Sequence, residues 1–239
     1  MPDTLQDRTI LITGASGALG SVAAREFAQT QARLALTGRS EKKLDKLAAG
    51  LALPPERILT AVADVTQAES VDRLVAAVRD RFGSVDVLLN IAGGWSGGKS
   101  LGETPIEDWD RMLALNLRSA FLLSRAVLPA MLDAGWGRIV FVSSKTAVSP
   151  RAKQAGYAVS KMSLITLAET IAAETKGSGV TANAILPSII DTPTNREFMP
   201  KADPSKWVPP QHIAATMRFL CSDEGASTNG AQIAMYGNV

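Results

Sequence analysis

Cysteine and histidine each occur only once in this chain of 239 residues, as Cys221 and His212. A single thiol cannot form an internal disulfide, which favours a reducing compartment, so we expect a cytoplasmic protein with Cys221 buried near a helix end. A single histidine cannot found a metal site or a serine–histidine–aspartate triad. No cluster of ligands suggests a metal, so none is expected, and His212 is assigned to a helix surface.

Excess charge of one sign and long apolar runs are lacking as well. The chain has 25 Lys and Arg against 23 Asp and Glu, a formal net charge of +2. Such a balance gives no electrostatic reason to expect nucleic acid or an acidic membrane as partner. No stretch approaches the ~18 uncharged apolar residues of a membrane span. Met1–Arg8 is polar and lacks the pattern of a signal peptide, so none is expected.

Short apolar runs alternate along the chain with longer segments of helical spacing. The expected strands are Thr9–Ile12, Arg33–Thr37, Ile58–Ala63, Val85–Asn90, Arg138–Val142, Val180–Leu186 and Ala231–Met235. The expected helices are Leu19–Gln29, Glu41–Leu51, Ala68–Arg81, Ile106–Leu132, Gln154–Thr175 and Gln211–Cys221. This alternation predicts one α/β domain over residues 1–239, a Rossmann-like, doubly wound parallel sheet of about seven strands with helices on both faces. Pro187–Pro210 is rich in proline without a clear period, which predicts a functional loop.

A glycine-rich turn follows the first expected strand. Gly14, Gly17 and Gly20 lie where the chain passes from that strand into the first expected helix. Glycines there allow a tight turn and close approach of backbone to a pyrophosphate, which the positive end of the helix attracts. The segment therefore predicts a dinucleotide site. The alternative is a glycine-rich turn that binds nothing.

The end of the second expected strand bears on the choice of dinucleotide. An acidic residue at this place would bind the adenosine ribose hydroxyls and select NAD, but none is present. Gly38 leaves room instead, and Arg39 offers donors suited to a 2′-phosphate. We therefore expect NADP (NADPH) as cofactor, with NAD less favoured. The alternative is that Arg39 is only the solvated start of a charged helix.

A tyrosine and a lysine stand one turn apart at the start of an expected helix. Tyr157 and Lys161 share a face at this spacing, and an ammonium beside a phenol stabilises the phenolate, as acid/base chemistry near neutrality requires. The alternative is a pair of solvated polar residues on an amphipathic helix.

Ser143–Ser144 follows the strand before this helix, where a hydroxyl can donate to a substrate carbonyl oxygen. A serine that only turns the chain is the other reading.

With these motifs the chain resembles the short-chain dehydrogenase/reductase superfamily, from about Arg8 to the C-terminus. The resemblance implies a catalytic tetrad of Asn116, Ser144, Tyr157 and Lys161, and the family spacing selects Ser144 over Ser143. It implies a carbonyl reductase, which interconverts a carbonyl and an alcohol by NADP(H)-dependent hydride transfer with Tyr157 as general acid/base. Lys161 would also bind the nicotinamide ribose, and Asn116 would hold a water in the proton relay.

The resemblance also implies contacts beyond the tetrad. The expected cofactor contacts are Gly14, Ser16, Gly17, Leu19, Gly20, Arg39, Asp64, Val65, Asn90, Ala92, Gly93, Tyr157, Lys161, Pro187, Ile190 and Thr192. The expected substrate contacts are Trp95, Ser144 and Tyr157, with residues 187–210 as the substrate loop. Three positions depart from the family pattern: Ala18, Ile91 and Ser188 stand where the family usually has Gly, Asn and Gly.

Other functions remain open from the sequence. Ala92–Gly98 is similar to a segment of dihydropteridine reductases, which reduce quinonoid pterins, and a 3-oxoacyl-thioester reductase is a further candidate. A non-catalytic NADP-binding sensor or scaffold is an alternative of another class. The resemblance implies a homo-oligomer, a tetramer or dimer, assembled through Ile106–Leu132 and Gln154–Thr175. Those helix faces belong to the intrachain core in the alternative view.

Overall fold

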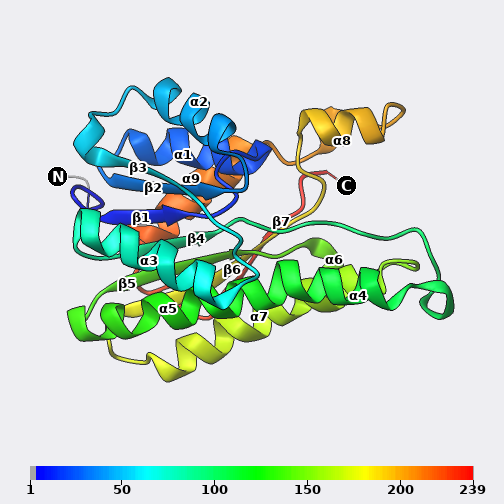
Figure 1. Ribbon diagram of the computed structural model, residues 1–239. Helices are drawn as coiled ribbons and strands as arrows, with labels where there is room; N and C mark the ends of the chain where they lie inside the picture. The colour runs from blue at the N-terminus through cyan, green and yellow to red at the C-terminus, as the bar shows by residue number, and fades with distance from the viewer. Residues whose placement is uncertain (1–3, 239) are drawn as a thin grey trace.

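A seven-stranded, wholly parallel sheet forms the centre of the computed structural model, which describes residues 4–238. The strands are β1 (Thr9–Ile12), β2 (Arg33–Gly38), β3 (Ile58–Val62), β4 (Val87–Asn90), β5 (Gly137–Val142), β6 (Val180–Pro187) and β7 (Gln232–Met235). Their order across the sheet is β3-β2-β1-β4-β5-β6-β7 (Figure 1). Strands β2 and β3 are therefore added on one side of β1, and β4 to β7 on the other. The doubly wound α/β fold expected from the sequence is confirmed, and each strand lies within two residues of its expected range.

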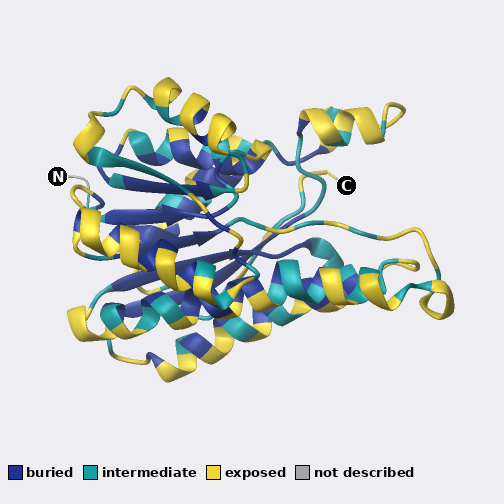
Figure 2. Ribbon diagram, viewed as in Figure 1, coloured by how far each residue is buried: buried dark blue, intermediate teal, exposed yellow. Residues whose placement is uncertain are grey.

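Helices cover both faces of the sheet. One layer holds α1 (Ala18–Ala28), α2 (Glu41–Leu51) and α9 (Pro210–Cys221). The other layer holds α3 (Ala68–Phe82), α5 (Ser119–Ala134) and α7 (Ala155–Glu174). Phe27 and Met217 pack in the first layer, and Phe82 and Leu123 in the second, so the strands between them are buried on both sides (Figure 2).

Among the helices of residues 4–238, none combines the length and apolar character that crossing a membrane requires.

The long helix expected over Ile106–Leu132 is divided. It consists of α4 (Ile106–Met112), a π-helical turn η3 (Leu113–Arg118) and α5. The π-helical stretch has only six residues, too few to establish a period of its own, so the sequence pattern does not reveal it. Such turns occur often at functional sites, and this one carries the expected tetrad residue Asn116.

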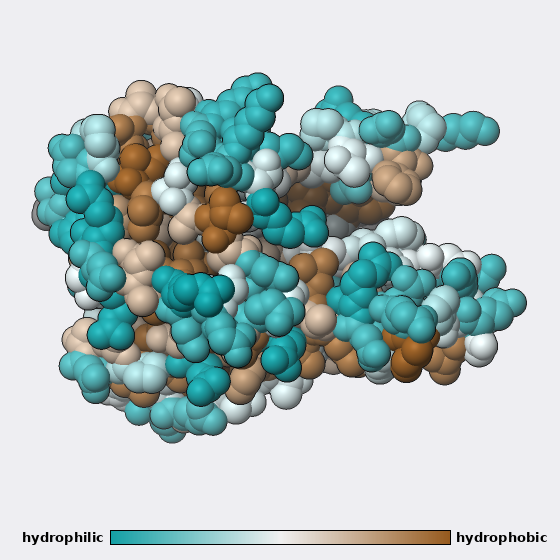
Figure 3. Space-filling model, viewed as in Figure 1, coloured by the Kyte–Doolittle hydropathy of each residue, from teal (hydrophilic) through white to brown (hydrophobic). Residues whose placement is uncertain are grey.

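The segment expected as an irregular loop, Pro187–Pro210, contains short helices. Thr192 caps α8 (Pro193–Phe198) by accepting the Asn195 amide N–H at 3.2 Å, and Pro204–Lys206 forms the 3-10 turn η4. A helix of six residues is too short to show a period, which is why the sequence gives no sign of it. Helix α8 stands away from the sheet, and an open cleft separates it from the part of the molecule that contains α4 (Figure 3).

The parallel strands bring the predicted site residues to one edge. The carboxyl ends of the strands lead into the glycine turn after β1, Arg39 after β2, Asp64 after β3, Ala92 after β4, Ser144 after β5 and Ser188 after β6. The short helix α6 (Lys145–Val148) and the elements η1 (Pro55–Arg57) and η2 (Leu101–Glu103) complete the connections. Ligands of open parallel sheets bind at this edge, beside the strand where the order reverses.

Candidate active site

The glycine turn after β1 can pack this closely against its own backbone and against Ala92 only because its glycines lack side chains. Gly14 has φ +61°, and a Cβ on Gly14 would lie 3.0 Å from the Cα of Ala92. A Cβ on Gly20 would lie 2.2 Å from the Gly14 carbonyl oxygen. Helix α1 begins at Ala18 with no side chain capping its first amides, so a pyrophosphate would find free N–H donors there. Ala18, the first residue of α1, is exposed at this end of the helix, whereas the side chain of Leu19 is buried in the core.

Arg39 is exposed just beyond β2 and, within residues 4–238, forms no hydrogen bond or ion pair. Beside it, a Cβ on Gly38 would lie 3.2 Å from Ser16 Oγ, so the phosphate turn and the end of β2 adjoin. Asp64 accepts hydrogen bonds from Thr66, at 2.7 Å from Oγ1 and 3.0 Å from the amide. These bonds, with a smaller effect of the Arg39 charge, hold the pKa of Asp64 below its ordinary value. An exposed cation and a carboxylate therefore lie near each other beyond the neighbouring strands β2 and β3, beside buried Val65.

The side chain of Thr13 joins the glycine turn to the end of β4. Its Oγ1 accepts the amide N–H groups of Ile91 and Ala92, both at 3.0 Å, and lies 3.2 Å from Asn90 Oδ1. The departure at Ile91 therefore leaves this junction intact, because the backbone of residue 91 makes the bond. The Asn90 Nδ2 donor is buried without a partner among the described residues. Nothing in the sequence pattern singled out Thr13, since its role depends on a strand distant in the chain.

Gly93 brings this segment against two members of the expected tetrad. A Cβ on Gly93 would lie 2.7 Å from Asn116 Oδ1 and 3.1 Å from Lys161 Nζ. Asn116 is buried in η3, where its Oδ1 accepts the Gly94 amide N–H at 2.9 Å. Its Nδ2 donates to the Gly94 carbonyl at 3.1 Å and to Ser160 Oγ at 3.0 Å. The structure therefore places Asn116 and Lys161 together behind the Gly93 backbone.

Lys161 lies in the second turn of α7 and is buried. Its Nζ donates to the carbonyl oxygen of Val142, at the end of β5, at 2.8 Å. Burial lowers the pKa of Lys161 to about 8, because a low-dielectric surrounding disfavours the ammonium. Ser143 donates through Oγ to the Lys161 carbonyl at 2.7 Å, so this serine supports the helix, whereas the hydroxyl of Ser144 is the one that bonds to Tyr157.

Tyr157 is half-buried one turn before Lys161 and shares a side-chain hydrogen bond with Ser144. Burial raises the pKa of Tyr157 above its ordinary value, and the bond to Ser144 offsets only part of that rise. The spacing suggests that Lys161 would lower this pKa, but within the polypeptide desolvation is the larger effect. Ser144 Oγ also accepts the Thr146 amide N–H at 3.1 Å, which fixes the hydroxyl at the start of α6.

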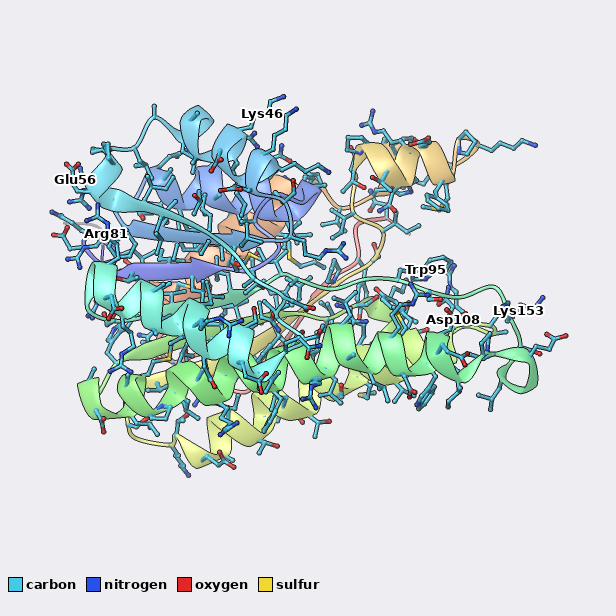
Figure 4. The ribbon with its side chains drawn as sticks, in the orientation of Figure 1. Lys46, Glu56, Arg81, Trp95, Asp108 and Lys153 are labelled. Carbon is cyan, nitrogen blue, oxygen red and sulfur yellow. The ribbon has the colours of Figure 1, made fainter. Side chains whose placement is uncertain are left out.

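Two segments flank the cleft beneath α8 (Figure 3). Trp95 is 54% exposed and lies on the side facing α8 (Figure 4). Its segment is held by the Gly98 amide N–H, which donates to the Lys153 carbonyl at 2.8 Å. Across the cleft, Pro187 ends β6, and the Ile190 carbonyl accepts Asn195 Nδ2 at 2.8 Å. Thr192 caps α8, so the segment that carries Pro187, Ile190 and Thr192 leads directly from β6 into that helix. Among residues 4–238, no three His, Cys, Asp or Glu side chains gather as metal ligands.

The chain matches known proteins along most of its length. The family model for short chain dehydrogenases matches residues 8–203. D-threitol dehydrogenase of Mycolicibacterium smegmatis is 33% identical, covering 98% of this chain and 93% of that protein. D-beta-hydroxybutyrate dehydrogenase of Rhizobium meliloti is 30% identical, with 96% and 97% covered. A 3-oxoacyl-(acyl-carrier-protein) reductase of Thermotoga maritima is 30% identical, with 98% of each chain covered.

The fold is shared with a solved structure. A crystal structure from Brucella melitensis, described as a short-chain dehydrogenase/reductase and a glucose/ribitol dehydrogenase, superposes with a TM-score of 0.90. The two chains are 30% identical, and the match covers 99% of this chain and 98% of the other. Because the family match and its relatives span nearly the whole sequence, the chain belongs to the short-chain dehydrogenase/reductase family of NAD(P)-dependent oxidoreductases.

Proposed function

We propose that this protein interconverts a carbonyl and an alcohol by NADP(H)-dependent hydride transfer, with Tyr157 as general acid/base. One observation carries the proposal: a half-buried tyrosine, hydrogen-bonded to Ser144, lies one helical turn from a buried lysine beside the dinucleotide turn. Its acidic proton, its hydroxyl partner and a nearby cation are the groups that proton transfer to a carbonyl oxygen requires. A sensor or scaffold would have no need of this arrangement.

Each residue has a distinct role in reduction. The substrate oxygen is held between the hydroxyls of Ser144 and Tyr157, and the bound nicotinamide supplies the hydride. Tyr157, whose pKa burial raises above its ordinary value, gives its proton to the oxygen as negative charge develops. Lys161 stabilises the resulting phenolate, and Asn116 holds the water that returns a proton. Oxidation of an alcohol follows the same steps in reverse.

Side chains of the cleft between Trp95 and the substrate loop, residues 187–210, would select the substrate. Phe198 on α8 is 74% exposed and Trp95 is 54% exposed, so both walls offer apolar side chains. Similar proteins are named for a threitol, a hydroxybutyrate and a 3-oxoacyl group, which share a hydroxyl or oxo group on carbon. We therefore propose a small ketone or secondary alcohol with an apolar part.

A substrate panel tests this function. NADPH and NADH oxidation would be followed by absorbance with small ketones, a 3-oxoacyl thioester and a quinonoid dihydropterin, each in parallel. We expect a ketone or thioester to be reduced, with NADPH preferred. Turnover of the pterin alone would favour the dihydropteridine-reductase alternative. NADPH binding without turnover of any compound would favour the sensor or scaffold.

The preference for NADP rests on Arg39, and its removal should weaken that preference. Charge-assisted hydrogen bonds contribute about 1.5–3 kcal/mol, so Arg39→Ser should raise KM for NADPH roughly 10- to 100-fold. KM for NADH should change little, because NADH has no 2′-phosphate. Lys46→Ser, which removes an exposed charge on α2, is the matched control (Figure 4). Equal effects of the two substitutions on NADPH would contradict a direct contact.

We also propose that the chain forms a homo-oligomer, a dimer or tetramer, through α5 and α7. Apolar residues surround α7 instead of following one side, and Val159 and Met162 on α7 and Phe121 on α5 are exposed. A helix that is apolar all round is buried in an assembly or a core. Light scattering should give a multiple of the 25.2 kDa chain mass, and Met162→Lys should lower it. A wild-type mass of one chain would overturn the assembly.

A further inference from the structure

The hydroxyl of Ser160 lies between two members of the tetrad. Ser160 is wholly buried in α7, directly before Lys161. Its Oγ donates to the carbonyl oxygen of Tyr157 at 2.9 Å and accepts from Asn116 Nδ2 at 3.0 Å. The tetrad residue on η3 is thereby connected to the turn of α7 that carries Tyr157.

These two bonds determine which end of the Asn116 amide faces α7. A hydroxyl has a single proton, and Ser160 uses it on the Tyr157 carbonyl, so only its lone pairs face Asn116. A lone pair requires a donor, which is Nδ2. Oδ1 then points to the Gly94 amide N–H, a donor at 2.9 Å that would repel Nδ2 in the opposite orientation. Ser160 and Gly94 therefore select the same amide orientation.

We propose that Ser160 is a positioning residue, which orients Asn116 and holds η3 in register with α7. This inference rests on the proposed function, because it matters only if Asn116, Tyr157 and Lys161 act together. A Cβ on Gly93 would lie 2.7 Å from Asn116 Oδ1 and 3.1 Å from Lys161 Nζ, so the two side chains approach the same residue and a shift of Asn116 should disturb the surroundings of Lys161. Displacement of a catalytic group by about 1 Å is enough to slow turnover ~100-fold, so loss of one such bond should be visible in kcat.

The first test compares two serines of α7. Ser160→Ala should lower kcat about tenfold and leave KM for the substrate within twofold, since the proposed substrate contacts Trp95, Ser144 and Tyr157 keep their side chains. Ser163→Ala is the matched control: Ser163 Oγ donates to the Ser160 carbonyl at 2.8 Å, the same type of bond, but does not contact Asn116. The pH profile of kcat should shift in Ser160→Ala and coincide with that of the wild type in Ser163→Ala. Equal kcat and superimposed profiles in the two variants would overturn the proposal.

A double-mutant cycle gives a second, independent test. If Ser160 acts through Asn116, then Ser160→Ala should have no further effect on kcat once Asn116→Ala is present. If the loss of kcat in the double variant equalled the product of the losses in the two single variants, the proposal would be overturned. This comparison remains valid even if each variant loses some stability. Tyr157→Phe is measured in the same series. Full turnover in Tyr157→Phe would overturn the proposed function itself. Independent effects of Ser160→Ala and Asn116→Ala on kcat would overturn only the role of Ser160.

Discussion

Tyr157→Phe should lower kcat by about 10²- to 10⁴-fold, the range typical of losing a positioned general acid. The substitution removes the phenol oxygen and its proton, and it also removes the hydrogen bond with Ser144. The ring remains, so the packing of the first turn of α7 is kept. Dissociation constants for NADPH, measured by fluorescence titration, should stay within about threefold, because the dinucleotide turn after β1 is untouched. Stopped-flow reduction of the best ketone in the panel gives kcat.

The chain offers a matched control for this substitution in its only other tyrosine, Tyr236. Tyr236 lies just beyond β7, with the Lys145 ammonium 5.0 Å from the centre of its ring. Tyr236→Phe keeps that ring and removes only a hydroxyl, so kcat should remain within about twofold of wild type. A large loss in Tyr236→Phe, or none in Tyr157→Phe, would contradict the assignment of the acid/base to Tyr157.

Lys161→Met should change how stability depends on pH. The ordinary lysine pKa of 10.5 falls to about 8 in the folded protein because the ammonium is buried. Between these values the unfolded chain holds a proton that the folded chain has released, so the free energy of unfolding rises with pH. The rise amounts to at most about 3.5 kcal/mol between pH 8 and 10.5, at ~1.4 kcal/mol per pKa unit, and methionine abolishes it.

Urea unfolding at pH 7.5, 9 and 10.5 measures this effect as the difference between wild type and Lys161→Met. Groups that titrate elsewhere cancel in the difference. Lys176→Met, at an exposed lysine just after α7, is the control and should show no such rise relative to wild type. If the curves for wild type and Lys161→Met ran parallel from pH 7.5 to 10.5, Lys161 would not be a buried, destabilised ammonium.

The layers and most of the site are predictable because their signals are local. Strands buried on both faces appear as continuous apolar runs, and the glycines of the β1 turn are required by backbone geometry within a few residues. The four-residue step from Tyr157 to Lys161 also lies within one helix. The position of Arg39 follows from the end of β2, so these features needed no knowledge of distant contacts.

The remaining features depend on contacts between distant segments, which periodicity does not encode. The π-turn around Asn116 and the six-residue helix α8 are too short or too subtle to change an apolar pattern. Thr13 and Ser160 acquire their roles from β4 and η3, far away in sequence. The pKa of Tyr157 is raised although a lysine is near, because Lys161 Nζ is turned to the Val142 carbonyl and burial dominates.

The place of β1 in the sheet has a consequence for the nascent chain. β1 is synthesised first, and its neighbour β2 follows shortly, but its other neighbour β4 does not exist until residue 90 has been made. Until then the apolar residues Ile10, Leu11 and Ile12 lack one of the two strands with which they pair in the finished sheet. Unpaired apolar strands are templates for wrong association, so the long interval before β4 is made leaves this stretch open to non-native pairing.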